Sequence, residues 1–247
     1  MIPIRDRNPS EITPWVVYVL IAINAAAFLY EISLPEAQLK RLVMTYGFVP
    51  RRASAALQGQ KSLLGAFLLP LFSCMFLHGG WLHLLGNMWF LYIFGDNVEA
   101  RLRHLPFLGF YIGCGLLASL AQYALAPETP VPTVGASGAI AGVLGAYIIT
   151  WPRAKIVTLV PIFYMITFVQ LPAVMVLGFW FVIQFFQGIG SLGARYASSG
   201  VAYWAHVGGF AAGLVLMKLL PQRKGVARQR RNHDGAKSGR GRSDWWG

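Results

Sequence analysis

The chain has 247 residues, of which 56% are hydrophobic and only 12% are charged. This composition and a mean hydropathy of +0.53 exclude an ordinary soluble domain built around one core, and they indicate a membrane protein with several spans. The formal net charge of +12 comes largely from the C-terminal end, without a folded basic domain beside it, which argues against binding to nucleic acid.

Six apolar segments are candidates for membrane-spanning helices. In chain order, they are residues 14–32, 81–98, 105–125, 135–151, 171–189 and 202–220. The fourth is short for a full crossing and starts at a glycine-rich turn, as a helix that begins partway into the membrane would. We therefore predict an all-α membrane protein in which residues 14–220 form a bundle of six transmembrane helices.

Two further apolar stretches do not fit as spans. Residues 63–77 carry Pro70 in their middle, and residues 156–168 are separated from the fifth span by Pro172. Because proline removes a backbone donor and interrupts a helix, we predict that both stretches are interfacial or re-entrant segments.

The basic residues predict which way the bundle faces. With residues 1–13 in the cytoplasm, fifteen of the 21 Lys and Arg residues lie inside, nine of them from Lys218 onward. Five of the other six lie in the connection after the first span, which counts against this orientation. The opposite orientation, however, would send the nine across the membrane, so we predict that both termini are cytoplasmic.

Residues 221–247 form a basic tail, rich in Arg, Lys, Gly and Ser, that we predict to be disordered. Two interpretations of the tail stay open. It binds the anionic headgroups of the bilayer, or it is a solvated segment that only sets the topology.

The cysteines and acidic residues predict little chemistry. Cys74 and Cys114 lie in apolar sequence and are interpreted as packing residues, since a disulfide would require their segments to meet at the same depth. The chain has no His-Glu-x-x-His motif for zinc, and Asp96 is one carboxylate where an aspartyl intramembrane protease needs two. We therefore expect no metal and no cofactor.

A serine and a histidine lie within apolar sequence. Ser137 belongs to the Gly-Ala-Ser-Gly turn that opens the fourth span, and His206 lies in the Ala-His-Val-Gly-Gly sequence of the sixth. A serine hydroxyl becomes a good nucleophile when a base takes its proton, and histidine is the usual base. Ser137 alone would more often be structural. The two together predict nucleophilic catalysis within the bilayer.

Further hydrogen-bond donors are expected near this pair. The free N–H groups of the first helical turn at Ser137 would face an oxyanion formed there. His83 and Asn87 are four residues apart, so they share one face of the second span and both can donate to an oxyanion. The alternative is that these two side chains only bond to another helix.

Glycine spacing predicts which helices meet. Gly138 and Gly142 in the fourth span, and Gly209 and Gly213 in the sixth, form small-xxx-small ridges that permit close backbone approach. Since Ser137 and His206 immediately precede these ridges, contact along them would bring the hydroxyl and the imidazole to similar depth.

These motifs resemble those of the rhomboid intramembrane serine proteases. The resemblance rests on Gly-x-Ser-Gly at the head of a short fourth helix, Ala-His-x-x-Gly in the sixth and His-x-x-x-Asn in the second, and it covers roughly residues 12–220. It implies a six-transmembrane-helix rhomboid-like bundle and a Ser137–His206 catalytic dyad. It also implies an oxyanion hole made by His83, Asn87 and the Ser137 amide.

The resemblance further implies what such an enzyme cuts. Family members cleave single-span membrane proteins near the outer face of the membrane, without a cofactor, and the fifth helix acts as a lateral gate. We expect a multi-pass protein of a bacterial plasma membrane.

The chain departs from the family pattern at Ala141, where some members carry a tyrosine that stacks on the catalytic imidazole. Trp204, or no group at all, is then expected to orient His206. Glu99 and Arg101 resemble a family pattern at the end of the second helix and are interpreted as structural.

Two other functions compete with proteolysis. A catalytically inactive rhomboid-like protein would bind transmembrane segments without cutting them, but it would be expected to have lost Ser137 or His206. A transporter would need acidic or basic residues within its spans, whereas here they cluster at the span ends.

Overall fold

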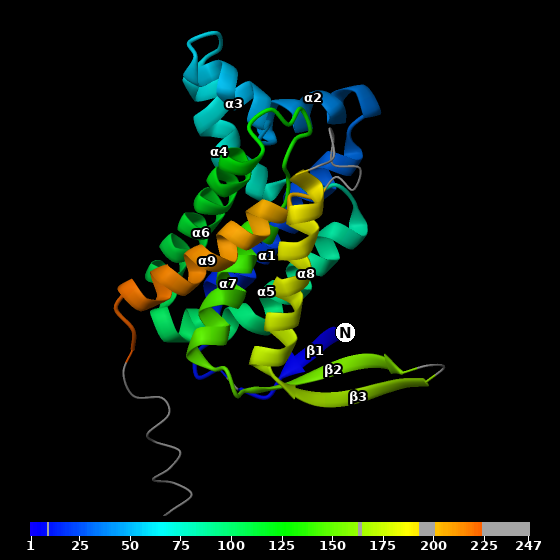
Figure 1. The fold of residues 1–247 in the computed structure, drawn as a ribbon, viewed down its shortest axis with the longest axis vertical. Helices are drawn as coiled ribbons and strands as arrows, with labels where there is room; N and C mark the ends of the chain where they lie inside the picture. Colours follow the sequence, from blue (N-terminus) through cyan, green and yellow to red (C-terminus); the bar gives the residue numbers. More distant parts are fainter. Residues whose placement is uncertain (9, 163–164, 193–200, 224–247) are drawn as a thin grey trace, which may run out of the picture.

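The computed structural model describes the chain except for residues 9, 163–164, 193–200 and 224–247. Figure 1 shows a bundle of helices with a small sheet at one end. The long helices are α1 (Trp15–Ser33), α5 (Trp81–Leu102), α6 (His104–Leu125), α7 (Ser137–Thr150), α8 (Ala173–Leu192) and α9 (Tyr203–Leu219). Shorter helical pieces follow α1, namely α2 (Glu36–Tyr46), α3 (Pro50–Leu57), η1 (Leu64–Leu68), α4 (Leu69–Ser73) and η2 (Cys74–Phe76).

A long helix lies over each of the six predicted apolar segments. Within the described residues, α1, α6 and α8 are long and apolar enough to cross a membrane. A fourth candidate is the pair made by residues 64–76 and α5, which is bent by 78° at its break, and α7 is a shorter apolar helix. The chain is therefore a multi-pass membrane protein with three or four spans by length and composition, and the count of six stays a prediction.

The prediction of an all-α fold is wrong in one respect. Strands β1 (Ile2–Asp6), β2 (Lys155–Ile162) and β3 (Met165–Pro172) form an antiparallel sheet in the order β1-β2-β3. Within the stretch that was expected to be interfacial or re-entrant, residues 156–162 belong to β2 and residues 165–168 belong to β3. Ile156 and Thr158 are buried while Lys155 is exposed, the alternation that a sheet with one covered face requires.

The loop between α7 and β2 holds the N-terminal end of α8. Because Leu171 and Pro172 belong to β3, the helix begins at Ala173 rather than at 171. The Ala173 amide donates to the Ala154 carbonyl at 2.9 Å, and the Val174 amide donates to the Pro152 carbonyl at 3.0 Å. These bonds satisfy amide groups that a helix N-terminus otherwise leaves without partners.

Helix α7 lies at the centre of the bundle, and its residues 138–147 are all buried. A Cβ atom added at Gly209 would lie 2.0 Å from the carbonyl oxygen of Gly138, and one at Gly213 would lie 1.9 Å from that of Gly142. Since no side chain fits in such a space, α7 and α9 touch backbone to backbone. The contact that the glycine spacing predicts is therefore confirmed.

Glu99 and Arg101 of α5 bind two other segments, the start of α1 and the residues that follow α9. The Glu99 carboxylate accepts hydrogen bonds from the Val16 and Val17 amides, at 3.0 and 2.8 Å, so it caps the start of α1. Arg101 donates to the Gln222 side chain at 3.0 Å and to the Arg223 carbonyl at 2.9 Å. The structural interpretation of both residues is confirmed. The predicted disorder of the tail concerns mainly residues 224–247, which lie outside the described residues.

The two cysteines are free and buried. The Cys74 thiol lies 3.5 Å from the Ser119 hydroxyl, and Cys114 packs where a Cβ at Gly142 would otherwise fit. Their interpretation as packing residues is confirmed.

Asp6 in β1 binds α5 and α7, and we expect its contribution to the stability of the fold to depend on pH. Burial raises the pKa of this carboxyl to about 6, although hydrogen bonds from the Tyr147 hydroxyl (2.7 Å) and the Asn97 amide (2.9 Å) oppose that shift. A carboxyl whose pKa is higher in the folded than in the unfolded state favours folding when it is protonated. Its contribution is therefore fully present below the unfolded value of 3.8 and is lost as the pH rises through about 6.

We expect the melting temperature of the purified protein in detergent to fall between about pH 4 and pH 7 by more in the wild type than in Asp6→Asn, whose side chain does not titrate. The same pH dependence in both proteins would contradict this account of Asp6.

Candidate active site

Ser137 is placed by a sharp turn at the start of α7. Gly135 has a φ of +119°, and its amide donates to the Cys74 carbonyl at 2.8 Å. A Cβ atom at this glycine would lie 2.6 Å from Nε2 of His83, so both the conformation and the space require glycine. Ser137 is the first residue of α7, where the backbone N–H groups have no partner inside the helix.

His206 lies in the first turns of α9 and faces Ser137. Its Nε2 atom is 2.8 Å from the Ser137 hydroxyl oxygen. This hydrogen bond joins a serine and a histidine that are 69 residues apart in the chain, and it follows from the close packing of α7 on α9. A hydroxyl in this contact can pass its proton to the imidazole.

His83 and Asn87 reach the same place from α5. The Gly79 amide donates to Nδ1 of His83 at 3.3 Å, which leaves Nε2 of this ring as the donor beside the Gly135 turn. The side-chain nitrogen of Asn87 is buried without a hydrogen-bond partner among the described residues. Two donors are therefore available where the sequence predicts them.

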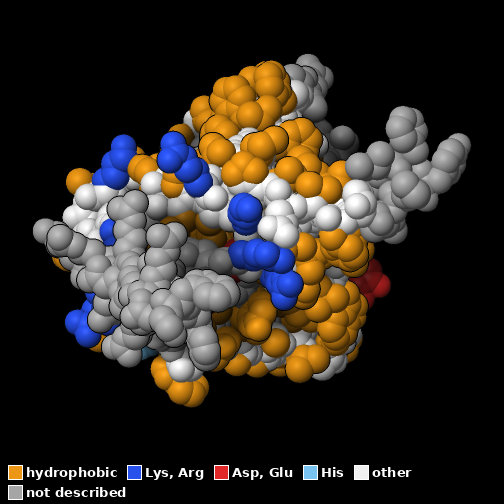
Figure 2. All heavy atoms as spheres, turned by 90° about the horizontal axis from the view of Figure 1, so that it is seen from below, with side chains coloured by type: hydrophobic (Ala, Val, Ile, Leu, Met, Phe, Trp, Pro, Cys, Tyr) orange, Lys and Arg blue, Asp and Glu red, His pale blue; other side chains and the backbone are white. Residues whose placement is uncertain are grey.

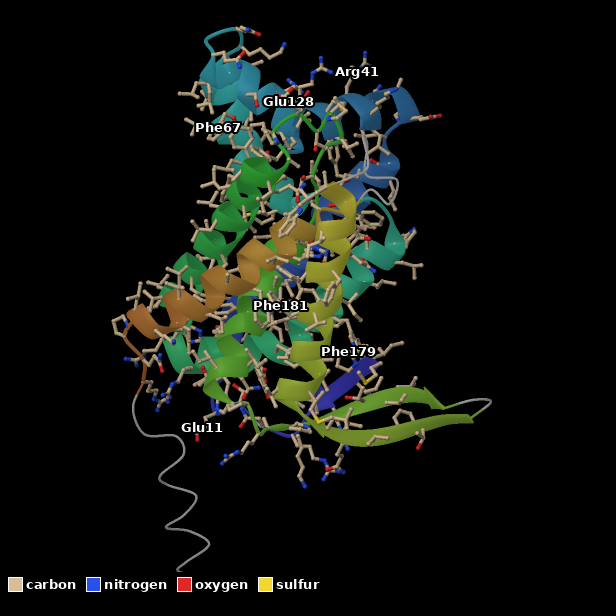
Figure 3. The ribbon with its side chains drawn as sticks, in the orientation of Figure 1. Glu11, Arg41, Phe67, Glu128, Phe179 and Phe181 are labelled. Carbon is tan, nitrogen blue, oxygen red and sulfur yellow. The ribbon has the colours of Figure 1, made fainter. Side chains whose placement is uncertain are left out.

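The four predicted site residues line one cavity of about 640 Å³. Helix α8 forms another part of its wall, and Figure 3 shows how the helix is oriented, with Phe181 on its inner side and Phe179 on its outer side. Phe181 packs on Phe210 of α9 with ring centroids 4.7 Å apart, whereas the Phe179 side chain is 50% exposed. The cavity thus lies between α5, α7, α8 and α9.

Two neighbours of His206 were not predicted from the sequence. The side-chain oxygen of Gln184 lies 2.7 Å from Nδ1 of His206, and the Trp180 ring lies 5.8 Å from the imidazole at a tilt of 36°. Trp204, the residue suggested for orienting His206, packs on Phe185 instead. Two glutamines in an otherwise apolar helix, Gln184 and Gln187, are the signal that could have directed attention to α8.

The other histidines with described positions lie outside this hydrogen-bonded pair. His78 is buried next to His83, with ring centroids 5.3 Å apart, and Nδ1 of His104 lies 2.5 Å from the Glu99 carboxylate. His233 lies outside the described residues.

Comparison with known proteins shows which family the chain belongs to. The family model "Rhomboid domain" matches residues 66–223, which is more than half of the chain. RHOMBOID-like protein 5 of Arabidopsis thaliana is 40% identical over 76 residues, which are 31% of this chain and 25% of that protein. Rhomboid-like protein 11, chloroplastic, of the same plant is 28% identical over 155 residues, which are 59% of this chain and 50% of that protein.

A third relative is presenilin-associated rhomboid-like protein A, mitochondrial, of Danio rerio. It is 31% identical over 97 residues, which are 38% of this chain and 25% of that protein. The chain thus spans half the length or less of these relatives. The matched range covers the turn at Ser137 and the helices that carry His83, Asn87 and His206. The chain belongs to the rhomboid family.

Proposed function

We propose that this protein is an intramembrane serine endopeptidase that cleaves transmembrane segments of membrane proteins. The observation that carries the proposal is the 2.8 Å contact between the Ser137 hydroxyl and Nε2 of His206, inside a cavity lined by further donors. The rhomboid family includes serine proteases, which agrees with this geometry, and it also includes inactive members.

The side chains at this site suffice for acyl transfer. Ser137 attacks the carbonyl carbon of the scissile peptide bond while its proton passes to Nε2 of His206. His206 then gives that proton to the leaving amine, and the C–N bond breaks. Water, deprotonated by the same imidazole, attacks the acyl-enzyme and releases the second product. No metal or cofactor enters these steps.

The negative charge of the tetrahedral intermediate is stabilised by donors on two helices. The Ser137 amide lies at the N-terminus of α7, and His83 and Asn87 face the cavity from α5. Asn87 is the best-supported oxyanion donor, because its side-chain nitrogen is buried without a hydrogen-bond partner in the described part of the chain. Such a donor is preorganised for a charge that develops only during the reaction.

Asn87→Ala is expected to lower kcat by a factor of about 10² to 10³. Loss of one oxyanion donor affects the transition state rather than substrate binding, so KM should change little. Steady-state cleavage in proteoliposomes gives both constants. Gln122→Ala, which removes another buried amide, is not expected to reproduce the kcat effect, because Gln122 binds the Ala205 backbone away from the cavity.

The same proposal includes the membrane topology. We infer six spans, both termini in the cytoplasm and single-span proteins as substrates that enter past α8. Figure 2 shows Lys and Arg side chains on the face seen from below, the end that carries the sheet in Figure 1, and a basic face is typical of the cytoplasmic side. The relatives come from a plant, a fish and a bacterium, Bacillus subtilis, so they do not single out a bacterial plasma membrane.

A catalytically inactive protein that binds transmembrane segments is the second candidate, since the family has such members. The test is cleavage of several single-span substrates by the purified protein in proteoliposomes. Cleavage that needs Ser137 supports the protease. Binding of the substrates by folded protein without any cleavage would overturn the protease and favour the inactive candidate.

A further inference from the structure

The base His206 has a hydrogen-bond partner on its far side. The side-chain oxygen of Gln184, near the middle of α8, lies 2.7 Å from Nδ1 of His206. The opposite ring nitrogen, Nε2, faces the Ser137 hydroxyl at 2.8 Å. The imidazole is therefore held between α7 and α8 by both of its nitrogens.

These two contacts select one tautomer of the neutral ring. For Nε2 to accept the proton of Ser137, it must carry no hydrogen, so the hydrogen of the ring must be on Nδ1. An N–H at Nδ1 needs an acceptor, and the amide oxygen of Gln184 is one. If the amide nitrogen of Gln184 faced Nδ1 instead, the hydrogen would sit on Nε2 and the base would have no free lone pair for Ser137.

Trp180 adds a second contact from the same helix. It precedes Gln184 by four residues, so both side chains lie on one face of α8, and its ring packs 5.8 Å from the imidazole. Ala141, at the position where some rhomboid proteases carry a stacking tyrosine, is fully buried and too small for that role. In this chain the support of the imidazole therefore comes from α8.

We propose that Gln184 is a positioning residue, which keeps His206 in the tautomer that accepts a proton from Ser137 and makes that state depend on the position of α8. The inference rests on the proposed function, because it assigns His206 the role of base. As the ring becomes protonated, the same amide oxygen continues to accept the Nδ1 hydrogen. The protonated base thus keeps its orientation until it passes its proton to the leaving amine.

The test replaces the amide by an apolar group of similar size. Gln184→Leu is expected to lower kcat about tenfold, the effect of one lost hydrogen bond, with KM little changed. Gln184→Glu retains an acceptor oxygen and is expected to recover most of the loss. The nitrogen NMR spectrum of protein labelled at histidine should show one tautomer for His206 in the wild type and in Gln184→Glu, but a mixture in Gln184→Leu. The His206 signals are assigned by their loss in His206→Asn.

The matched control is Gln187→Leu, the same substitution one turn further along α8. Gln187 lines the same cavity, but it has no hydrogen bond to His206 in the described structure, so the nitrogen signals of His206 should stay as in the wild type. A wild-type tautomer in folded Gln184→Leu would overturn the inference, as would an unchanged kcat. If the wild type cleaves no substrate while Gln184→Leu still alters the tautomer, the proposed function fails and the orienting role of Gln184 stands.

Discussion

Alanine in place of Ser137 is expected to bring cleavage of a single-span substrate in proteoliposomes below detection. Removing the nucleophile of a serine protease lowers kcat by a factor on the order of 10⁶, which is about as much as removing its base and far more than losing one oxyanion donor. The fold should survive, because the substitution removes one oxygen and alanine favours a helix at the start of α7. The measurement compares cleavage rates and melting temperatures of the two purified proteins.

Ser119→Ala is the matched control for this prediction. Ser119 is a serine in another apolar helix, where it is buried, and its hydroxyl contacts the Cys74 thiol at 3.5 Å rather than a histidine. This variant should cleave the substrate at close to the wild-type rate. Cleavage by purified Ser137→Ala at a comparable rate would show that another group performs the attack, and it would end the case for the Ser137–His206 dyad.

Alanine in place of Gly213 is expected to be the most damaging small change to the fold. The added Cβ would lie 1.9 Å from the carbonyl oxygen of Gly142 and 2.6 Å from its carbonyl carbon, and backbone atoms cannot turn aside as a side chain can. Overpacking a well-packed interior costs about 1–3 kcal/mol, and this contact belongs at or above the upper end of that range. Helices α7 and α9 would have to separate, which would also draw His206 away from Ser137.

Gly109→Ala separates this effect from the general consequences of replacing a helical glycine. Gly109 lies in α6, and a Cβ atom there would meet nothing within 4 Å. Its replacement should leave the protein as stable or slightly more stable, because alanine favours a helix by up to about 1 kcal/mol over glycine. Unfolding in mixed micelles, followed by circular dichroism, would rank the two variants. Equal stability would mean that α7 and α9 do not pack as closely as described.

The features that could be predicted from the sequence depend on local pattern. Long apolar runs place the helices to within a few residues, and the glycine ridges at Gly138 and Gly209 correctly predict which two helices touch. The contact between Ser137 and His206 follows from that packing, since both residues precede their ridges in register. In this part of the molecule, spacing along the chain determines position in space.

The features that were missed depend on contacts between distant segments. Strand β1 pairs with β2, which lies about 150 residues further along the chain, and no pattern in the short N-terminal segment indicates this pairing. Residues 156–168 were interpreted by their apolar content and by Pro172, and the alternation that buries Ile156 and Thr158 becomes visible only in the structure. Trp204, or no group at all, was expected to orient His206, whereas Gln184 and Trp180 reach the imidazole from α8, whose rotation is set by packing.

The bonds from Ala173 and Val174 to the loop after α7 fix the N-terminal end of α8, so any tilt of this helix turns about that end. Gln184 stands eleven residues above this fixed end, so its distance from the pivot is about 16 Å at 1.5 Å per helical residue. A tilt of about 10° around the pivot would then carry its side chain by about 3 Å, roughly the length of the hydrogen bond to His206. If the protein acts as proposed, a substrate that tilts α8 outward as it enters would break the hydrogen bond between Gln184 and His206, and His206 would accept a proton from Ser137 again only after the helix returns.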